Sequence, residues 1–471
     1  MIEMQVREAI KQISGFRYLI DRLELRSGVG RERILHQPWM ECSETIEKEL
    51  EKTEQIIRVA ATNPPLTCKF RKALERVKNI RGTIKRLSEN TVLDDLELFE
   101  IKNFASAVVE IRAFTEYCPV VELPDLTAVF VLLDPENTGI SHFYIYDVYS
   151  PDLAALRKEI RLKKSAGEEE VTEALYFKSV EIEDRVRGEL TVKLQGYKES
   201  LSKALEGVAH LDVLQAKALL AVQLDLCRPE VCVEGGEVYT AYEGLFHPEI
   251  KDNLQRNGKD YQAVDIVIRP EVTLITGANM AGKTVLLKSV ALSQCLCQFG
   301  FYVPAKCARV ASVAEVAISS GDGQDELSGL SSFAAEMLCV DRIIREVKAG
   351  RKILVLIDEL ARTTNPAEGR ALVCGVVELL AGAGVPVLIT THYSGIEGRC
   401  RRLRVRGFRE EKIEGALTLA NVTSFIDYSL VEEEREEVPR EAIRIAEILG
   451  VDGELLEKAR RVMEKENRIK K

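Results

Sequence analysis

The chain has few of the features that mark a protein for export or for a membrane. Its first residues, MIEMQVREAI, lack a basic stretch followed by an apolar core, so we expect no secretory signal. The most apolar stretch, residues 373–391, is interrupted by Glu378 and Pro386, which is typical of a buried helix and strand and not of a bilayer span. The sequence therefore predicts a cytoplasmic protein.

The sequence also lacks the cysteine and histidine spacing that is typical of disulfides or of a metal site. The 11 cysteines are scattered and odd in number, which favours reduced thiols. Cys227 and Cys232 have no second pair or histidine cluster to complete a zinc site. Aromatic residues make up only 6% of the chain and hydrophobic residues 46%, which predicts a largely helical globular protein with an aliphatic core.

The chain also has fewer basic than acidic residues. The net charge is −10, which argues against a surface covered with phosphate-binding Lys and Arg and leaves room for a local basic patch only. A length of 471 residues predicts about two to four domains.

The first half of the chain has the apolar spacing of helices. Residues 1–118 predict a succession of them, with a break at Asn63–Pro65. LTAVFVLLD and ISHFYIYDVY, joined by PENTG, predict a β-hairpin over 127–148. Ser150 and Pro151 mark the start of the next helix, and a long helical pattern follows over 171–224, with kinks expected at Gly188 and Gly196.

The second half alternates short apolar strands with helices. AVDIVI, VTLITG, KILVLID and VPVLITTHY are the strands, and this rhythm predicts a mainly parallel sheet covered by helices. An acidic run, VEEEREEV, leads to a closing helical segment.

Residues 277–284, GANMAGKT, fit the phosphate-binding pattern GxxxxGK[ST] between a strand and a helix. Glycines let backbone N–H groups approach phosphate oxygens, and the helix N-terminus adds a favourable dipole. Lys283 is expected to reach the β- and γ-phosphates, and Thr284 to coordinate Mg²⁺. The predicted nucleotide-binding residues are Gly277, Asn279, Met280, Ala281, Gly282, Lys283 and Thr284.

Two further strand ends carry candidate catalytic groups. KILVLIDEL ends in Asp358, placed to hold Mg²⁺, and Glu359, placed to orient or deprotonate the attacking water. His392 ends the strand VLITTHY and could sense or stabilise charge near the γ-phosphate, although a lone histidine is more often structural. With the phosphate loop, these residues predict an ABC-type ATPase that uses ATP and Mg²⁺.

ATPases of that type complete each site with a segment of a second subunit. DELSGLSSFAAEM offers Ser328, Gly329, Ser331 and Ser332 before a helix, a suitable anion-binding N-terminus, although an ordinary capped loop has the same composition. The segment does not spell LSGGQ, which argues against a transport cassette.

The order ITGANMAGKT, FGFYVPA, SGLSSFAAEM, LVLIDELARTTNPAEG and ITTHY resembles the ATPase domain of the MutS family of DNA mismatch-repair proteins, over residues 240–430. The resemblance implies a homodimer with two composite ATP sites, and it puts Tyr261 where the family stacks adenine on an aromatic ring. The chain departs from the family pattern in two motifs. Leu245 and Phe246 replace the Arg of a Gly-Arg-His-Pro lead-in, and Leu330 replaces an Arg of the signature loop.

Upstream segments resemble the family's lever, and DYSLV with the closing helices resembles its dimerisation tail. The implied fold is multidomain, an α-helical lever domain plus an α/β ABC-type P-loop ATPase domain. Its expected parts are a lever over 1–234 with the hairpin and a truncated clamp at about 162–190, the ATPase over 235–431 and a tail over 432–471. No mismatch-reading domain is recognised, since the single Phe-x-Glu, Phe114–Glu116, lies in a helical pattern.

The resemblance leaves two functions open. The first is an ATP-dependent DNA-binding protein of the mismatch-repair or recombination type, with a possible nucleic-acid contact at Arg157, Lys158, Arg161, Lys163 and Lys164, a run that could equally be a solvated helical face. The second is an ATP-driven remodelling factor that reactivates a cobalamin-dependent aminomutase such as lysine 5,6-aminomutase. ARTTNPAEG, the acidic charge and the short clamp favour this second function.

Overall fold

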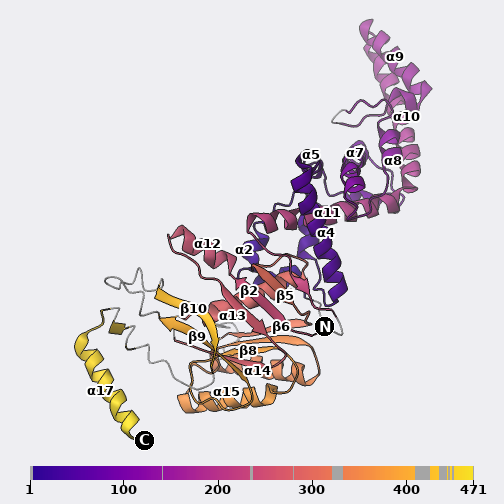
Figure 1. Cartoon of the computed structure of the whole chain (residues 1–471). Helices are drawn as coiled ribbons and strands as arrows, with labels where there is room; N and C mark the ends of the chain where they lie inside the picture. Colours follow the sequence, from indigo (N-terminus) through magenta and orange to yellow (C-terminus); the bar gives the residue numbers. More distant parts are fainter. Residues whose placement is uncertain are drawn as a thin grey trace. The chain divides into compact units, whose positions relative to one another are not determined.

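A computed structural model describes residues 4–139, 142–233, 237–278, 281–320, 332–408, 425–433, 443, 446–447 and 450–469 (Figure 1). The chain divides into two compact units. One contains Met1–Arg22, Pro38–Leu50 and Ala221–Lys471, and the other contains Leu23–Gln37 and Glu51–Leu220. We call the first the ATPase-type unit, after the domain that its sequence resembles, and the second the helical unit. None of the helices in the described ranges is both long and apolar enough to span a membrane.

The helical unit is built from helices throughout its described residues. They are α3 (Gly28–Leu35), the later part of α4 (Ser43–Thr62), α5 (Pro64–Glu75), α6 (Arg81–Ser88), α7 (Asp95–Tyr117), α8 (Thr127–Leu133), the 3₁₀ turn η1 (Asp147–Tyr149), α9 (Pro151–Ser165), α10 (Glu169–Gln195) and most of α11 (Lys198–Gln223). The predicted break at Asn63 is confirmed, because its side chain caps α5 and Pro64 is the first helical residue.

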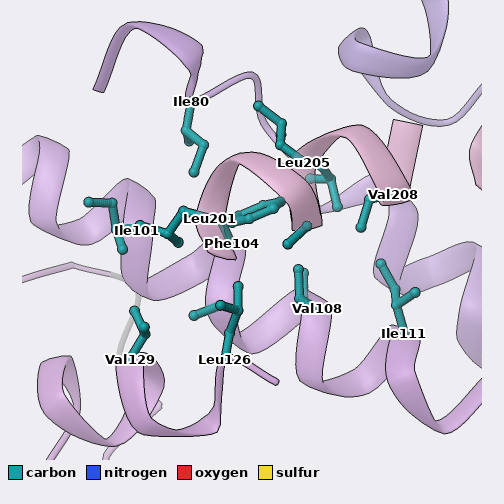
Figure 2. Packing of buried hydrophobic residues seen from close by; sticks show 14 of the residues in the cluster. Ile80, Ile101, Phe104, Val108, Ile111, Leu126, Val129, Leu201, Leu205 and Val208 are labelled. Atoms are coloured by element: carbon teal, nitrogen blue, oxygen red, sulfur yellow. The ribbon is translucent and has the colours of Figure 1, made fainter. Parts of the chain in front are cut away.

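Helix α7 is the centre of the helical core. Figure 2 shows Phe104 and Val108 of α7 between residues of α8 and α11, such as Val129 and Leu205. All of these side chains are buried. The same helix contains Phe114, whose ring stacks on Phe70 with centroids 4.1 Å apart. The Phe-x-Glu sequence therefore lies in a helix, as its pattern predicted, with Phe114 in the core and Glu116 exposed.

The predicted hairpin over 127–148 is wrong. Residues 127–133 form helix α8, and the described part of 134–148 contains no strand. The burial pattern gives the reason: Leu126, Val129 and Leu133 are fully buried while Val131 is 55% exposed, which is the spacing of one helix face and not the alternation of a strand. The β-branched composition of LTAVFVLLD was misleading because packing overrides it.

Helices α9 and α10 form an antiparallel pair in the place of the predicted truncated clamp (Figure 1). The Ser150 hydroxyl accepts a hydrogen bond from the Leu153 N–H at 3.3 Å, so the predicted helix start is confirmed. Gly167 turns the chain between the helices with a φ of +76°. The long pattern over 171–224 breaks at Gly196, whereas Gly188 lies inside the continuous helix α10.

The ATPase-type unit contains two sheets and their covering helices. Its remaining elements are α1 (Val6–Gln12), α2 (Phe16–Ile20), β1 (Glu230–Val231), β2 (Thr240–Leu245), α12 (Pro248–Arg256), β3 (Val264–Ile268), β4 (Val272–Thr276), α13 (Lys283–Gln298), β5 (Cys307–Val310), β6 (Glu315–Ser320), α14 (Ser332–Lys348), β7 (Ile353–Asp358), α15 (Pro366–Leu380), β8 (Val387–Thr390), β9 (Arg401–Phe408), β10 (Ile426–Glu432) and α17 (Gly453–Ile469).

The larger sheet has the order β10-β9-β4-β8-β7-β6, and all its pairs are parallel except β10 with β9. The predicted mainly parallel sheet is therefore confirmed. Ile353, Val355 and Ile357 of β7 share a buried cluster with residues of α14 and α15. Figure 1 shows these two helices beside the sheet. The smaller sheet, β1-β5-β2-β3, was not predicted, and AVDIVI, which was predicted with the parallel strands, forms β3 of this sheet and pairs antiparallel with β2.

Two groupings differ from the expected domains. Residues 1–22 and 38–50 belong to the ATPase-type unit, where Phe16 and Trp39 contact Phe299 at the end of α13. DYSLV, Asp427–Val431, lies in β10 of the larger sheet and not in a tail. Its alternating pattern pairs with β9, which places it in the ATPase-type unit.

Candidate nucleotide site

Three neighbouring strands of the larger sheet end at one edge and carry the candidate site. β4 ends at Thr276, β7 at Asp358 and β8 at Thr390, and β8 lies between the other two. Ligands of open parallel sheets bind at the carboxyl ends of the strands. The sequence-predicted residues of the phosphate loop, of the acidic strand end and of the ITTHY segment are therefore brought together.

The phosphate loop needs its glycines for space and for backbone conformation. Gly277 and Gly282 have φ values of +149° and +76°, a region that residues with a Cβ rarely adopt. A Cβ on Gly282 would also lie 2.8 Å from Cδ1 of Tyr428. Asn279 and Met280 lie outside the described residues.

Lys283 is the first residue of α13, and its side chain is 3% exposed. Its Nζ donates to the carbonyl oxygens of Gly277 and Ala278 at 2.9 and 3.1 Å. The same atom lies 3.5 Å from Oε1 of Glu359. The buried ammonium is thus held between the phosphate loop and the candidate base, where it can also reach a phosphate oxygen.

Thr284 and Asp358 supply oxygen atoms that fit a magnesium ion. The Thr284 hydroxyl donates to Oδ2 of Asp358 at 2.7 Å, and the Thr390 hydroxyl donates to Oδ1 at 2.6 Å. Mg²⁺ prefers a few hard oxygen ligands and keeps several waters, so one hydroxyl and one carboxylate are a suitable pair. Thr390 fixes the orientation of the carboxylate.

Glu359 occupies a strained turn. Its φ is +48°, and that of Ala361 is +59°, which costs non-glycine residues about 1–3 kcal/mol each. The Glu359 N–H donates to the Thr390 hydroxyl at 2.9 Å, and its Oε2 accepts from Nη1 of Arg362 at 3.2 Å. The Glu359 carboxylate therefore lies toward Lys283 on a turn whose backbone conformation is energetically unfavourable.

His392 follows the same strand end. Partial burial of its ring lowers its pKa, Lys283 and Arg362 lower it further, and the Glu359 carboxylate opposes them. The residue as a whole remains exposed, so its imidazole is accessible in the neutral form at pH 7. A neutral imidazole can donate one hydrogen bond to a charged oxygen.

A cavity of about 590 Å³ adjoins the phosphate loop. Tyr261 and Tyr428 both line it, together with Ala281 and Gly282 of the loop and Val285 of α13. Burial raises the pKa of both tyrosines, so their rings are neutral over the physiological range. The cavity has the size and the aromatic lining that suit a nucleobase.

The structure describes the predicted basic residues but not the side chains of the predicted signature residues. Ser328, Gly329 and Ser331 lie outside the described residues, as does the side chain of Ser332, the first residue of α14. Of the basic run, Lys158, Arg161 and Lys164 are exposed on α9. Lys163 pairs with Glu168 at 2.8 Å.

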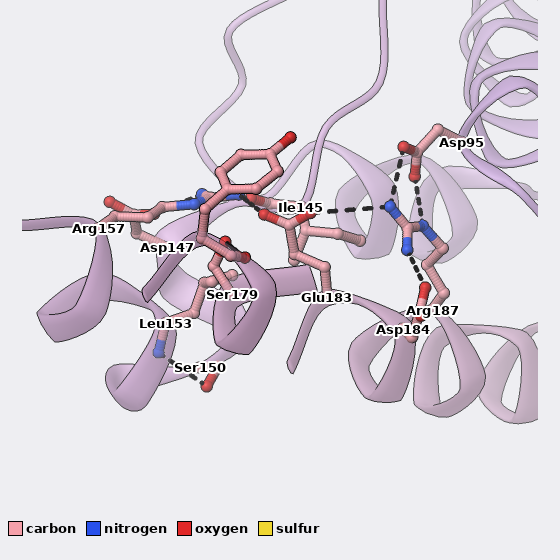
Figure 3. A network of polar contacts seen from close by, with 11 residues as sticks. Asp95, Ile145, Asp147, Ser150, Leu153, Arg157, Ser179, Glu183, Asp184 and Arg187 are labelled. Carbon is pink, nitrogen blue, oxygen red and sulfur yellow. Dashed lines mark hydrogen bonds and ion pairs between the residues drawn. The ribbon is translucent and has the colours of Figure 1, made fainter. Parts of the chain in front are cut away.

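Arg157 is part of an internal network and not a free cation. Its guanidinium donates to Asp147 at 2.6 Å, to the Ile145 carbonyl at 2.7 Å and to Glu183 at 2.8 Å. Figure 3 shows Glu183 between Arg157 and Arg187. This arginine therefore joins α9 to α10, and three of its five N–H donors are used within the chain, so the nucleic-acid contact at Arg157 stays a prediction.

Sequence reasoning missed four residues of the site. Thr390 could have been found, since it is a polar residue at the end of a buried strand, like Asp358. Tyr428 carried no such signal, because it enters the cavity from β10 after a long separation in sequence. Glu336 and Tyr393 contact the turn that follows β7 and are considered below.

Comparison with known proteins identifies the same part of the chain. MutS domain V matches residues 273–466. The Endonuclease MutS2 of Thermus thermophilus is 34% identical over 60% of this chain and 37% of its own length. That of Geobacillus thermodenitrificans is 30% identical over 68% of this chain and 38% of its own length.

A DNA mismatch repair protein MutS of Brevibacillus brevis is 36% identical over 43% of this chain and 23% of its own length. The chain thus spans well under half the length of these three relatives. MutS domain V is the ATPase domain of its family, and it covers the strand ends and helix α13 described above. The chain belongs to the MutS family.

Proposed function

We propose that the chain binds and hydrolyses ATP with Mg²⁺ at the edge formed by β4, β8 and β7. The observation that carries this proposal is that an ion pair between Lys283 and Glu359, at 3.5 Å, and a hydrogen bond from Thr284 to Asp358, at 2.7 Å, join the start of α13 to the end of β7. Phosphoryl transfer requires positive charge on the phosphates and a group that orients water, and these residues are of the required types.

Each residue has a distinct part in this proposal. Lys283 binds the β- and γ-phosphates, Thr284 and Asp358 hold Mg²⁺, and Glu359 orients and deprotonates the attacking water. Mg²⁺ supplies charge neutralisation on the phosphates when bound. His392 donates to the γ-phosphate, and Tyr261 stacks on adenine.

We further propose a homodimer in which Ser328, Gly329, Ser331 and Ser332 of one subunit complete the site of the other. The proposal rests on the ABC-type arrangement of the parallel sheet and on the sequence of the signature segment. A helix N-terminus rich in serine and glycine suits the negative charge of a γ-phosphate.

The biological role that we propose is ATP-dependent DNA binding of the mismatch-repair or recombination type. The names of the relatives and the exposed Lys158, Arg161 and Lys164 support it. The test is fluorescence anisotropy of homoduplex, mismatched and branched DNA, with and without ATP and Mg²⁺, at several salt concentrations. Three free cations predict a slope of log K against log[salt] no steeper than about −3.

A triple variant sharpens this test. Lys158→Ala, Arg161→Ala and Lys164→Ala together should remove most of the affinity and most of the salt dependence. The matched control replaces Lys69, Lys72 and Lys78, three exposed lysines elsewhere in the helical unit. Loss of binding in the control but not in the α9 variant would move the contact away from α9.

One observation favours a second function. Arg157 and Lys163, two of the five predicted contact residues, are neutralised by carboxylates within the chain. The alternative is an ATP-driven factor that remodels a protein client, of the kind that reactivates a cobalamin-dependent aminomutase. Active ATP hydrolysis without DNA binding would favour it, and Glu359→Gln would then be used to trap the client in a pull-down.

A further inference from the structure

The turn after β7 is held by contacts from two other elements. The turn contains Glu359 and Ala361, both with positive φ, and an internal bond from the Thr364 N–H to the Ala361 carbonyl at 3.2 Å. A turn with two such residues needs external contacts to keep its conformation. Ala361 is fully buried, and both of its backbone polar groups are bound by side chains.

The first contact comes from α14. The Glu336 carboxylate accepts a hydrogen bond from the Ala361 N–H, with its two oxygens at 3.2 and 3.3 Å from the nitrogen. Glu336 is 7% exposed, and burial raises its pKa. Burial of a carboxylate is unfavourable unless the carboxylate is hydrogen-bonded. The contact with the Ala361 N–H therefore indicates that Glu336 holds the turn in place.

The second contact comes from the residue after His392. The Tyr393 hydroxyl donates to the Ala361 carbonyl at 2.7 Å. Its approach requires a residue without a side chain on α15, since a Cβ on Gly369 would lie 2.3 Å from the tyrosine oxygen. Three segments that are distant in sequence therefore meet at one alanine.

We propose that Glu336 and Tyr393 are positioning residues that clamp Ala361 and thereby fix the direction of the Glu359 carboxylate. The inference rests on the proposed function, because it takes Glu359 as the base of ATP hydrolysis. It adds two residues that bind neither nucleotide nor metal. Their effect falls on the rate of hydrolysis and not on nucleotide affinity, because neither residue lines the cavity or the phosphate loop.

The test compares Tyr393→Phe in the full-length chain with the unaltered protein. Loss of one hydrogen bond at the turn should lower kcat roughly five- to tenfold, while the Kd for a fluorescent ATP analogue stays unchanged. Tyr149→Phe is the matched control, because the Tyr149 hydroxyl donates to the Leu132 carbonyl at the same distance, 2.7 Å, in the helical unit. Unchanged kcat in Tyr393→Phe would overturn the proposal.

Glu336 provides a second measurement with a conservative rescue. Glu336→Ala removes the acceptor and should lower kcat by a similar factor, whereas Glu336→Gln keeps an oxygen for the Ala361 N–H and should restore most of it. Equal loss in both variants, or a weaker Kd in either, would contradict a positioning role. Absence of hydrolysis by the unaltered protein is a separate result, which would overturn the proposed function itself.

Discussion

Lys283 has two roles, and one substitution removes both. In the structure its ammonium satisfies two loop carbonyls, and in the proposed complex it binds phosphate oxygens. We expect Lys283→Ala to raise the Kd for ATP roughly a hundredfold, because a charge-assisted contact in a buried site is lost. Equilibrium binding of a fluorescent ATP analogue measures it. Lys288→Ala, on the same helix, is the control, and equal loss there would point to general damage of α13.

Glu359→Gln tests the base without changing the shape of the side chain. The amide keeps the contact distances but cannot accept a proton, so kcat should fall by about 10²- to 10⁴-fold while the Kd for ATP changes little. Steady-state phosphate release is the measurement. Substantial turnover in this variant would remove Glu359 as the base.

His247 predicts how stability depends on pH. The residue is fully buried, and burial lowers its pKa to about 4, below an ordinary value of 6.5. Above pH 6.5 both folded and unfolded chains have a neutral imidazole. Between pH 6.5 and 4 only the unfolded chain binds the proton, so stability falls as the pH falls, by about 3 kcal/mol in total.

The measurement is the urea midpoint of unfolding from pH 7.5 to 4.5. His247→Asn retains a residue that can cap α12 but cannot titrate, so its midpoint should depend less on pH than that of the unaltered chain. His36→Asn, at an exposed histidine, is the control. A pH dependence that is identical in all three proteins would exclude His247 as its source.

At the scale of residues, the sequence is sufficient where a function is local. Gly277, Gly282, Lys283 and Thr284 follow from one short motif, and the structure brings them together with Asp358 as predicted. Glu336 and Tyr393 could not be predicted in this way. Their role depends on a contact with Ala361 that only the folded sheet and helices create.

At the scale of elements, the start of α3 depends on a side chain from α11. Asp212, fully buried, accepts hydrogen bonds from the Arg26 N–H at 3.0 Å, the Ser27 N–H at 2.8 Å and the Ser27 hydroxyl at 2.6 Å. Asp212→Ala would leave these buried donors without an acceptor. We expect a loss of roughly 2–4 kcal/mol in the free energy of unfolding, measured by denaturant titration.

Two glycines of α3 give a matched pair for the same contact. A Cβ on Gly30 would lie 2.3 Å from Oδ2 of Asp212, whereas a Cβ on Gly28 would meet nothing within 4 Å. Gly30→Ala should therefore destabilise the chain, and Gly28→Ala should be neutral or slightly stabilising. Equal effects of the two substitutions would contradict the close packing of Asp212 on α3.

Element type was predicted best where periodicity and composition agree. The parallel strands β4, β7 and β8 have both, whereas α8 has the composition of a strand and the periodicity of a helix. Giving more weight to the spacing of Leu126, Val129 and Leu133 would have identified the helix. The smaller sheet was missed because its strands come from separate parts of the chain, and only β3 was recognised as a strand, as part of the parallel sheet.

At the scale of the whole molecule, the order of strands and the grouping of residues 1–22 with the ATPase-type unit had no sequence signal. Both depend on contacts between distant segments, which composition and periodicity do not encode. The dimer that we propose also depends on contacts that no motif encodes, in this case between the surfaces of two subunits. We therefore test it by removing a candidate contact surface.

Helix α17 offers such a surface. Leu455 and Val462 lie seven residues apart on one helix face and are 59% and 58% exposed. Deleting the chain from Ile443 should weaken self-association, and Leu455→Ser with Val462→Ser should do the same more mildly. Light scattering across a range of concentrations measures it, with Val131→Ser, at a residue 55% exposed in the helical unit, as control.

Because a composite site needs two subunits, loss of the dimer should also make the ATPase rate per subunit fall on dilution. A dimer that survives the deletion would assign self-association to another surface. A deleted chain that is monomeric yet hydrolyses ATP at the full rate would show that one subunit forms a complete site, and the proposed role of Ser328 and Ser331 across the dimer would be wrong.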